Sequence, residues 1–99
     1  MEEYRIRWLT QAAEELKEIR GYIEDDKKAP EAAAALVAEI YEAANSLSFM
    51  PQRYQRDPER PKYRRLVVIS TYSIFYQVEG RLVYIAYIRN NARSKKDLD

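Results

Sequence analysis

The sequence predicts an α+β fold with the element order β-α-α-β-β-β, in which a hairpin of two helices packs on one face of a small, mainly antiparallel sheet. Two segments between residues 11 and 47 carry apolar residues at helical spacing. A short run of period two precedes them, and three β-rich runs with short connections follow them. Since neither element type can bury its apolar face alone, helices and sheet are expected to pack together as one domain spanning residues 1–99.

The first predicted strand covers residues 4–8, where apolar and charged residues alternate. This alternation places the apolar side chains on one face of the strand and the two arginines on the other. Thr10 provides a hydroxyl that suits a helix N-cap, and a first helix is expected from about Gln11 to Asp25. Gly21 within this helix is expected to mark the close approach of another backbone segment.

A second helix is expected to begin near Pro30, because the first turn of a helix leaves its N–H groups unpaired and proline lacks this group. Its apolar stripe runs from Ala33 to Leu47, so the two helices form an antiparallel hairpin. A loop follows at residues 50–62, with three prolines and four positive charges against two negative ones. Its length and charge indicate more than a connection.

Three strands are expected after this loop, at residues 65–69, 74–78 and 82–88, and they form an antiparallel meander. Glu79-Gly80 suits a two-residue turn between the last two strands. Tyr72 and Tyr76 lie on one face of the middle strand, which indicates that both are core or half-core residues and that only their hydroxyl groups could be functional.

The composition excludes several kinds of chemistry. The chain contains no cysteine and no histidine, so disulfides, thiolate nucleophiles, zinc–thiolate sites and imidazole catalysis are ruled out. Gly21 and Gly80 are the only glycines, so there is no glycine-rich phosphate loop, and no carboxylate-rich metal constellation is evident. No cofactor and no metal are therefore expected.

The expected location is the cytoplasm. The longest uncharged apolar run has seven residues, which is too short for a membrane span, so no membrane contact is expected. The amino terminus is acidic, whereas a secretory signal is basic and then apolar.

Charge is distributed unevenly along the chain. Residues 1–49 hold 6 Lys and Arg against 11 Asp and Glu, whereas residues 50–99 hold 11 against 5. This asymmetry suggests that the second half contacts an anion or an acidic partner, although ordinary solvated helix faces explain the first half equally well.

The candidate binding residues lie in this basic half. In the loop, Tyr54 with its neighbours Arg53 and Arg56 could stack on a base or fill a pocket of a partner, and packing of the loop is the alternative. Arg64 and Arg65 are adjacent on a strand, so they are expected to point to opposite faces.

One of these two adjacent arginines is expected to pair with a helix carboxylate such as Glu14 or Glu18, and the sequence leaves open which of them is exposed. Arg89 and Arg93 flank the polar turn after the last strand, where a solvated strand end is the alternative explanation. If these two converge with Arg65, a phosphate or carboxylate site results.

The chain resembles the RelE/ParE superfamily of bacterial toxins from type II toxin–antitoxin pairs over nearly its whole length. Four motifs in order carry the resemblance: residues 10–16 (TQAAEEL), 47–54 (LSFMPQRY), 63–68 (YRRLVV) and 72–78 (YSIFYQV), the last leading into residues 87–89 (YIR). The resemblance implies a small growth-inhibiting toxin that a cognate antitoxin neutralises by lying across its surface.

Two kinds of target are known for such toxins. RelE-like members cleave messenger RNA in the ribosome, and the resemblance implies that Arg64, Arg65 and Arg93 would be the catalytic residues of such a ribonuclease. Ser73 stands where these enzymes have an arginine, and the tail ends in acidic residues where they have an aromatic residue or histidine. The sequence therefore leaves enzymatic activity uncertain.

ParE-like members instead inhibit DNA gyrase and need a binding surface rather than an acid and a base. The sequence favours this interpretation, with RNA cleavage as the alternative. A third alternative is an interaction module without toxicity, whose sheet holds a partner or forms a homodimer.

Overall fold

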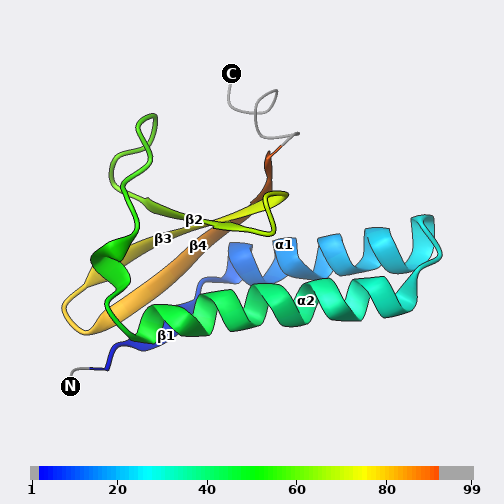
Figure 1. Cartoon of the computed structure of the whole chain (residues 1–99), viewed down its shortest axis with the longest axis horizontal. Helices are drawn as coiled ribbons and strands as arrows, with labels where there is room; N and C mark the ends of the chain where they lie inside the picture. Colours follow the sequence, from blue (N-terminus) through cyan, green and yellow to red (C-terminus); the bar gives the residue numbers. More distant parts are fainter. Residues whose placement is uncertain (1–2, 92–99) are drawn as a thin grey trace.

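The computed structural model describes residues 3–91, which form a four-stranded sheet with two long helices side by side on one of its faces (Figure 1). The elements along the chain are β1 (Arg5–Trp8), α1 (Thr10–Gly21), α2 (Pro30–Asn45), β2 (Arg64–Val68), β3 (Tyr72–Glu79) and β4 (Leu82–Asn90). Three short helical turns complete them: η1 (Tyr22–Asp26), η2 (Ser46–Ser48) and η3 (Pro51–Arg53).

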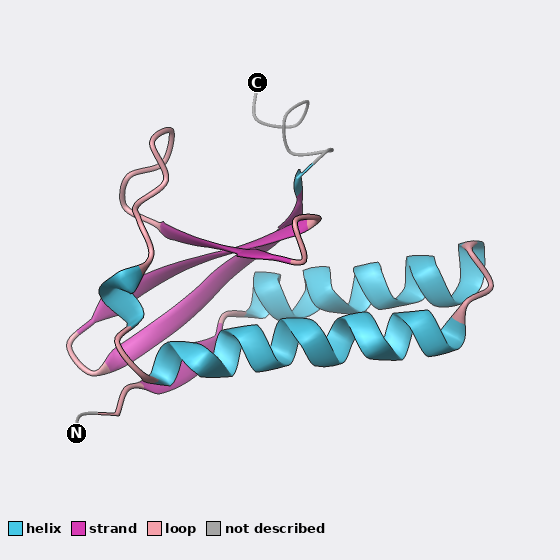
Figure 2. Cartoon of the chain, in the orientation of Figure 1, coloured by secondary structure: helices cyan, strands magenta, loops and turns pink. Residues whose placement is uncertain are grey.

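The strands are arranged in the order β1-β4-β3-β2 (Figure 2). β2, β3 and β4 form the predicted antiparallel meander, and β1 joins β4 in parallel. A register shift between Phe75 and Tyr76 leaves Ala86 of β4 without a residue opposite it, which is a β-bulge. The predicted α+β class, with a helical hairpin on a mainly antiparallel sheet, is confirmed.

The hydrophobic core lies between the helices and the sheet. Tyr72, Ile74 and Tyr76 of β3 are all buried, which confirms the prediction that the two tyrosines are core residues. The largest fully buried apolar side chains are those of Tyr76, Ile40, Leu47, Ile74, Ile85 and Val83. No helix within residues 3–91 has both the length and the apolar character that a transmembrane segment requires.

Two predictions about the first helix are wrong. Thr10 is the first residue of α1 rather than its N-cap, because Leu9 continues the pairing of β1 by donating its N–H to the carbonyl of Ile85, 3.0 Å away. Gly21 has no neighbouring atom within 4 Å of the position that a Cβ would take. Its place is instead the point where α1 passes into the wider π-helical turn η1.

The ends of two strands also differ from the prediction. Glu79 pairs with Leu82, so the hairpin turn consists of Gly80 and Arg81 rather than Glu79 and Gly80. Gly80 has a φ of 60°, which suits the first position of a tight hairpin turn. β2 ends one residue early, because Ile69 adopts a left-handed φ of 46° and begins the turn to β3.

Candidate functional site

Arg65 and Ser73 occupy the sheet face that turns away from the helices, since they alternate with residues of the core. Arg65 Nε donates to Ser73 Oγ at 2.8 Å, and Arg65 Nη2 donates to Asn91 Oδ1 at 3.1 Å. The third nitrogen, Nη1, lies 3.9 Å from Asp57 Oδ1, and the guanidinium stacks over the Phe75 ring at 5.7 Å. Through these contacts Arg65 of β2 connects the loop after α2, strand β3 and the residue that follows β4.

The carboxylate that Arg65 meets belongs to the loop and not to a helix. The predicted pairing of Arg64 or Arg65 with Glu14 or Glu18 is therefore wrong. The physical reason is that Asp57 is almost fully buried in the loop beside β2, where its charge needs a partner.

Arg89 is held by a different carboxylate. Its Nε lies 3.4 Å from Glu15 Oε2, in an orientation that makes an ion pair but no hydrogen bond, and its guanidinium covers the Tyr87 ring at 4.9 Å. Glu15 also accepts the backbone N–H of Ile88 at 2.8 Å through its other oxygen. Arg65 and Arg89 thus both carry a charge partner within the chain, and Arg93 lies outside the described residues.

Arg53 and Tyr54 also have structural partners. The Arg53 guanidinium donates to the carbonyl of Phe49, to that of Met50 at 3.2 Å and to Ser46 Oγ at 3.3 Å. The same group lies 4.7 Å from the centre of the Tyr54 ring, which packs against the hydrophobic core. Of the two explanations for Tyr54, the structure supports packing of the loop.

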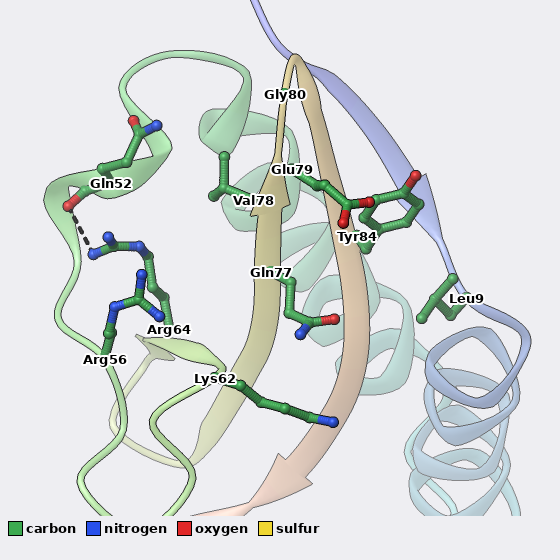
Figure 3. A pocket seen from close by; sticks show the side chains of 10 residues that line it. All are labelled: Leu9, Gln52, Arg56, Lys62, Arg64, Gln77, Val78, Glu79, Gly80 and Tyr84. Carbon is green, nitrogen blue, oxygen red and sulfur yellow. Dashed lines mark hydrogen bonds between the residues drawn. The ribbon is translucent and has the colours of Figure 1, made fainter.

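A hollow of about 570 Å³ lies between the loop after α2 and the β3–β4 hairpin (Figure 3). Two predicted residues, Arg56 and Arg64, line it together with Lys62, which the sequence analysis had not singled out. The signal was present in the sequence, since Lys62 is one of the four positive charges of the loop. The full lining consists of Leu9, Gln52, Arg56, Lys62, Arg64, Gln77, Val78, Glu79, Gly80 and Tyr84.

Backbone carbonyls fix the two arginines of the hollow. Arg64 Nη1 donates to the carbonyls of Gln52 at 3.1 Å and Tyr54 at 2.8 Å, and Arg56 Nη1 donates to that of Pro61 at 2.9 Å. Among residues 3–91, no carboxylate lies within ion-pair distance of either guanidinium. Within the described part of the chain, these two guanidinium groups therefore have no carboxylate partner, in contrast to those of Arg65 and Arg89.

The opposite wall of the hollow has a different character. Gln77 and Tyr84 face each other across β3 and β4, and Glu79 lies beside Tyr84 on the side away from the arginines (Figure 3). The hollow thus has two guanidinium groups on its loop side and amide, phenol and carboxylate groups opposite, and the Lys62 side chain reaches across towards β4 (Figure 3).

Two phenols of the region stay protonated at neutral pH. Burial raises the pKa of Tyr76 to about 12, and its hydroxyl donates to the buried carbonyl of Pro51 at 2.5 Å. Burial, with a contribution from neighbouring Tyr87, also raises the pKa of Tyr63. Neither group is suited to accept a proton in catalysis near pH 7. No three carboxylates come together as a metal site within the part of the chain that the structure describes.

Comparisons with known proteins agree with this fold. A family model described as the ParE toxin of the type II toxin–antitoxin system parDE matches residues 6–94. No curated protein sequence matches the chain. A solved chain of the chromosomal ParDE system from P. aeruginosa is 27% identical, with a TM-score of 0.74 over 88% of this chain and 95% of that one.

Two further solved structures share the fold. A chain of the RelBE2 toxin–antitoxin complex from Mycobacterium tuberculosis has a TM-score of 0.64 at 22% identity, covering 91% of this chain and 93% of that one. YafQ from E. coli strain BL21(DE3) has a TM-score of 0.53 at 14% identity, covering 92% and 97%. Because the family model spans most of the sequence, the chain belongs to the ParE toxin family of type II toxin–antitoxin systems, within the RelE/ParE superfamily.

Proposed function

We propose that this ParE-family toxin inhibits growth by binding a protein target, DNA gyrase, and that it does not cut RNA. Membership of the family implies a cognate antitoxin that neutralises the toxin. Among the residues predicted to contact the target, Arg56 and Arg64 are proposed to do so, because their charges lack a carboxylate partner among the described residues. Arg53, Tyr54, Arg65 and Arg89 are proposed to support the fold.

One observation carries the proposal against RNA cleavage: Arg65 and Arg89, the described arginines nearest to the position of Ser73, are each held by a carboxylate of the chain itself. A ribonuclease of this kind needs cations that are free to stabilise the phosphate in the transition state, as well as a base and an acid. Arg65 is further occupied by hydrogen bonds to Ser73 and Asn91, and the chain contains no histidine.

Ribosome-dependent RNA cleavage is the second candidate, and the hollow is the observation that favours it. Its three cations, which have no carboxylate partner among residues 3–91, could contact a phosphate there. The hollow would still have to supply the base and the acid from residues such as Glu79 and Tyr84.

The test uses the purified toxin in two assays. DNA supercoiling by gyrase is measured over a series of toxin concentrations, and cleavage of ribosome-bound message is mapped by primer extension in parallel. We expect loss of supercoiling and intact message. Cuts at fixed codon positions together with full gyrase activity would establish the ribonuclease instead.

Two variants make the experiment sharper. Arg56→Gln is expected to weaken gyrase inhibition, whereas Arg60→Gln, which removes a charge from the same loop outside the hollow, is expected to leave it unchanged.

If induction of the unmodified toxin without its antitoxin leaves growth unaffected, the third alternative, an interaction module without toxicity, is correct.

A further inference from the structure

We propose that the hollow lined by Arg56, Lys62 and Arg64 is the binding site for an extended acidic segment of a partner protein. Asp and Glu side chains of that segment contact the two guanidinium groups and the Lys62 ammonium at separate points of the hollow, and its backbone amides meet the polar side chains of the opposite wall. This inference names the chemistry of the partner at the site proposed above, so it rests on the proposal that the toxin acts through protein binding.

The first argument is the way in which the donors are held. Arg56 and Arg64 each use Nη1 to bind loop carbonyls, so the guanidinium groups are fixed before any ligand arrives. A guanidinium has five N–H groups, and those that remain match the two oxygens of a carboxylate. Because the side chains are already ordered, binding costs little conformational entropy.

The second argument concerns Lys62, whose ammonium lies 5.3 Å from the centre of the Tyr63 ring and has no carboxylate partner among the described residues. With the two arginines it gives the lining three positive charges, and Glu79 contributes the single negative one. The net charge of the site therefore favours an anionic ligand.

The third argument separates a peptide from a nucleic acid. A volume of about 570 Å³ exceeds what one carboxylate needs, so the ligand extends across the hollow. A nucleic acid would bring a second phosphate towards Glu79, where like charges repel. An extended peptide would bring amide groups instead, which can bond to Gln77, Tyr84 and the Glu79 carboxylate.

The test measures fluorescence anisotropy at low ionic strength with three labelled probes. The first is a peptide of alternating Glu and Gly, the second is its Gln and Gly counterpart, and the third is a single-stranded oligouridine of similar length. We expect the acidic peptide to bind most tightly, and its neutral counterpart to bind at least roughly tenfold more weakly.

Variants then assign the binding to this site. Lys62→Gln removes a charge without removing a hydrogen bond among the described residues and is expected to weaken peptide binding roughly three- to fivefold. Combining it with Arg56→Gln is expected to weaken binding by a further factor of similar size. Arg60→Gln is the matched control, because it removes one positive charge from the same loop outside the hollow. It is expected to change the affinity by less than about twofold. Thermal unfolding of each variant confirms that it is folded.

Two results would overturn the proposal. Equal losses for the Lys62 and Arg60 variants would mean that the peptide senses only the overall charge. Tighter binding of oligouridine than of the acidic peptide, abolished by the same two variants in the hollow, would mean that the site holds nucleic acid. The peptide assay contains no gyrase and the supercoiling assay contains no peptide, so failure of either proposal is seen separately.

Discussion

Replacement of Glu15 by alanine should destabilise the protein more than any other single change to a helix carboxylate. β1 pairs with β4 only from Leu82 to Ile85, so within residues 3–91 the N–H groups further along this edge of β4 have no strand beside them. Glu15 of α1 takes that place at Ile88, accepting its N–H at 2.8 Å, and it also faces Arg89 at 3.4 Å. One side chain therefore connects the helix layer to the edge of the sheet.

The magnitude follows from these two contacts. A hydrogen bond to a charged acceptor contributes about 1.5–3 kcal/mol, and its loss leaves the N–H of buried Ile88 without its acceptor. The ion pair is partly buried, with 30% of the Arg89 side chain and 17% of the Glu15 side chain exposed, and adds about 0.5–1 kcal/mol. Glu15→Ala should therefore lower the free energy of unfolding by about 2–4 kcal/mol and the Tm by roughly 10–30 °C. Glu15→Gln keeps an acceptor oxygen and should lose about half as much.

Urea unfolding followed by tryptophan fluorescence measures these differences, because Trp8 is the only tryptophan and packs against Tyr41. The matched control is Glu14→Ala, which removes a neighbouring exposed carboxylate from the same helix with the same change in helix propensity. If Glu15→Ala and Glu14→Ala differ by less than about 0.5 kcal/mol, the connection between α1 and β4 does not have the role described.

Tyr76→Phe should cost about 1–2 kcal/mol, because the buried carbonyl of Pro51 loses its donor. Burial raises the pKa of folded Tyr76 to about 12 from the ordinary value of 10.0. The contribution of this phenol to the free energy of unfolding is therefore complete below pH 10 and is lost as the pH rises through 12. Urea titrations over this pH range should show that loss for the unmodified protein and not for Tyr76→Phe. Asp57→Ala should loosen the basic loop, since its carboxylate accepts a loop N–H at 2.9 Å, and trypsin should then cut the loop faster in the folded protein. Substitutions in the β2–β3 turn and in the β3–β4 turn should change the free energy of unfolding in opposite directions in the same urea assay. Ile69→Gly relieves a left-handed φ at an exposed β-branched residue and should stabilise the protein by up to about 1 kcal/mol. Gly80→Ala places a side chain at a left-handed φ and should destabilise the protein by about 1 kcal/mol. Equal signs for these two changes would contradict the assigned turn geometry.

The arrangement of helices and strands was predictable because it depends on local periodicity. The alternation in residues 4–8, the apolar stripes of the two helices and the β-rich runs of the meander each require only a few neighbouring residues to be recognised. The precise ends were not predictable, since long-range contacts set them. Leu9 stays in register with β4 because it bonds to Ile85, and this displaced the start of α1 from the predicted cap.

The candidate site was predictable only in part for the same reason. The clustering of positive charge after α2 indicated Arg56 and Arg64 as binding residues, because a charge count needs no structure; both line the hollow, and their role in binding stays a prediction. The pairing of Arg65 with Asp57, and of Arg89 with Glu15, joins residues that local spacing cannot relate. Sequence alone could therefore count the arginines of this surface but could not separate those that pair with a carboxylate of the chain from those that have no such partner among the described residues.

The different roles of Arg53 and Arg64 both follow from the need of the loop after α2 for side-chain hydrogen-bond donors. The loop has little regular structure, so many of its carbonyls need donors from side chains, and arginine can supply several at once. Arg53 uses its donors within the loop and covers Tyr54, whereas Arg64 satisfies two carbonyls with one nitrogen and keeps its other N–H groups. A lysine at position 64 would carry the same charge but could not hold two carbonyls while presenting a planar pair of donors. Arg64 thus orders the loop, and in the proposal made above it also supplies donors to the anionic ligand. Replacing Arg64 should therefore lower both the stability of the loop and the affinity of the hollow, whereas replacing Lys62 should lower the affinity alone.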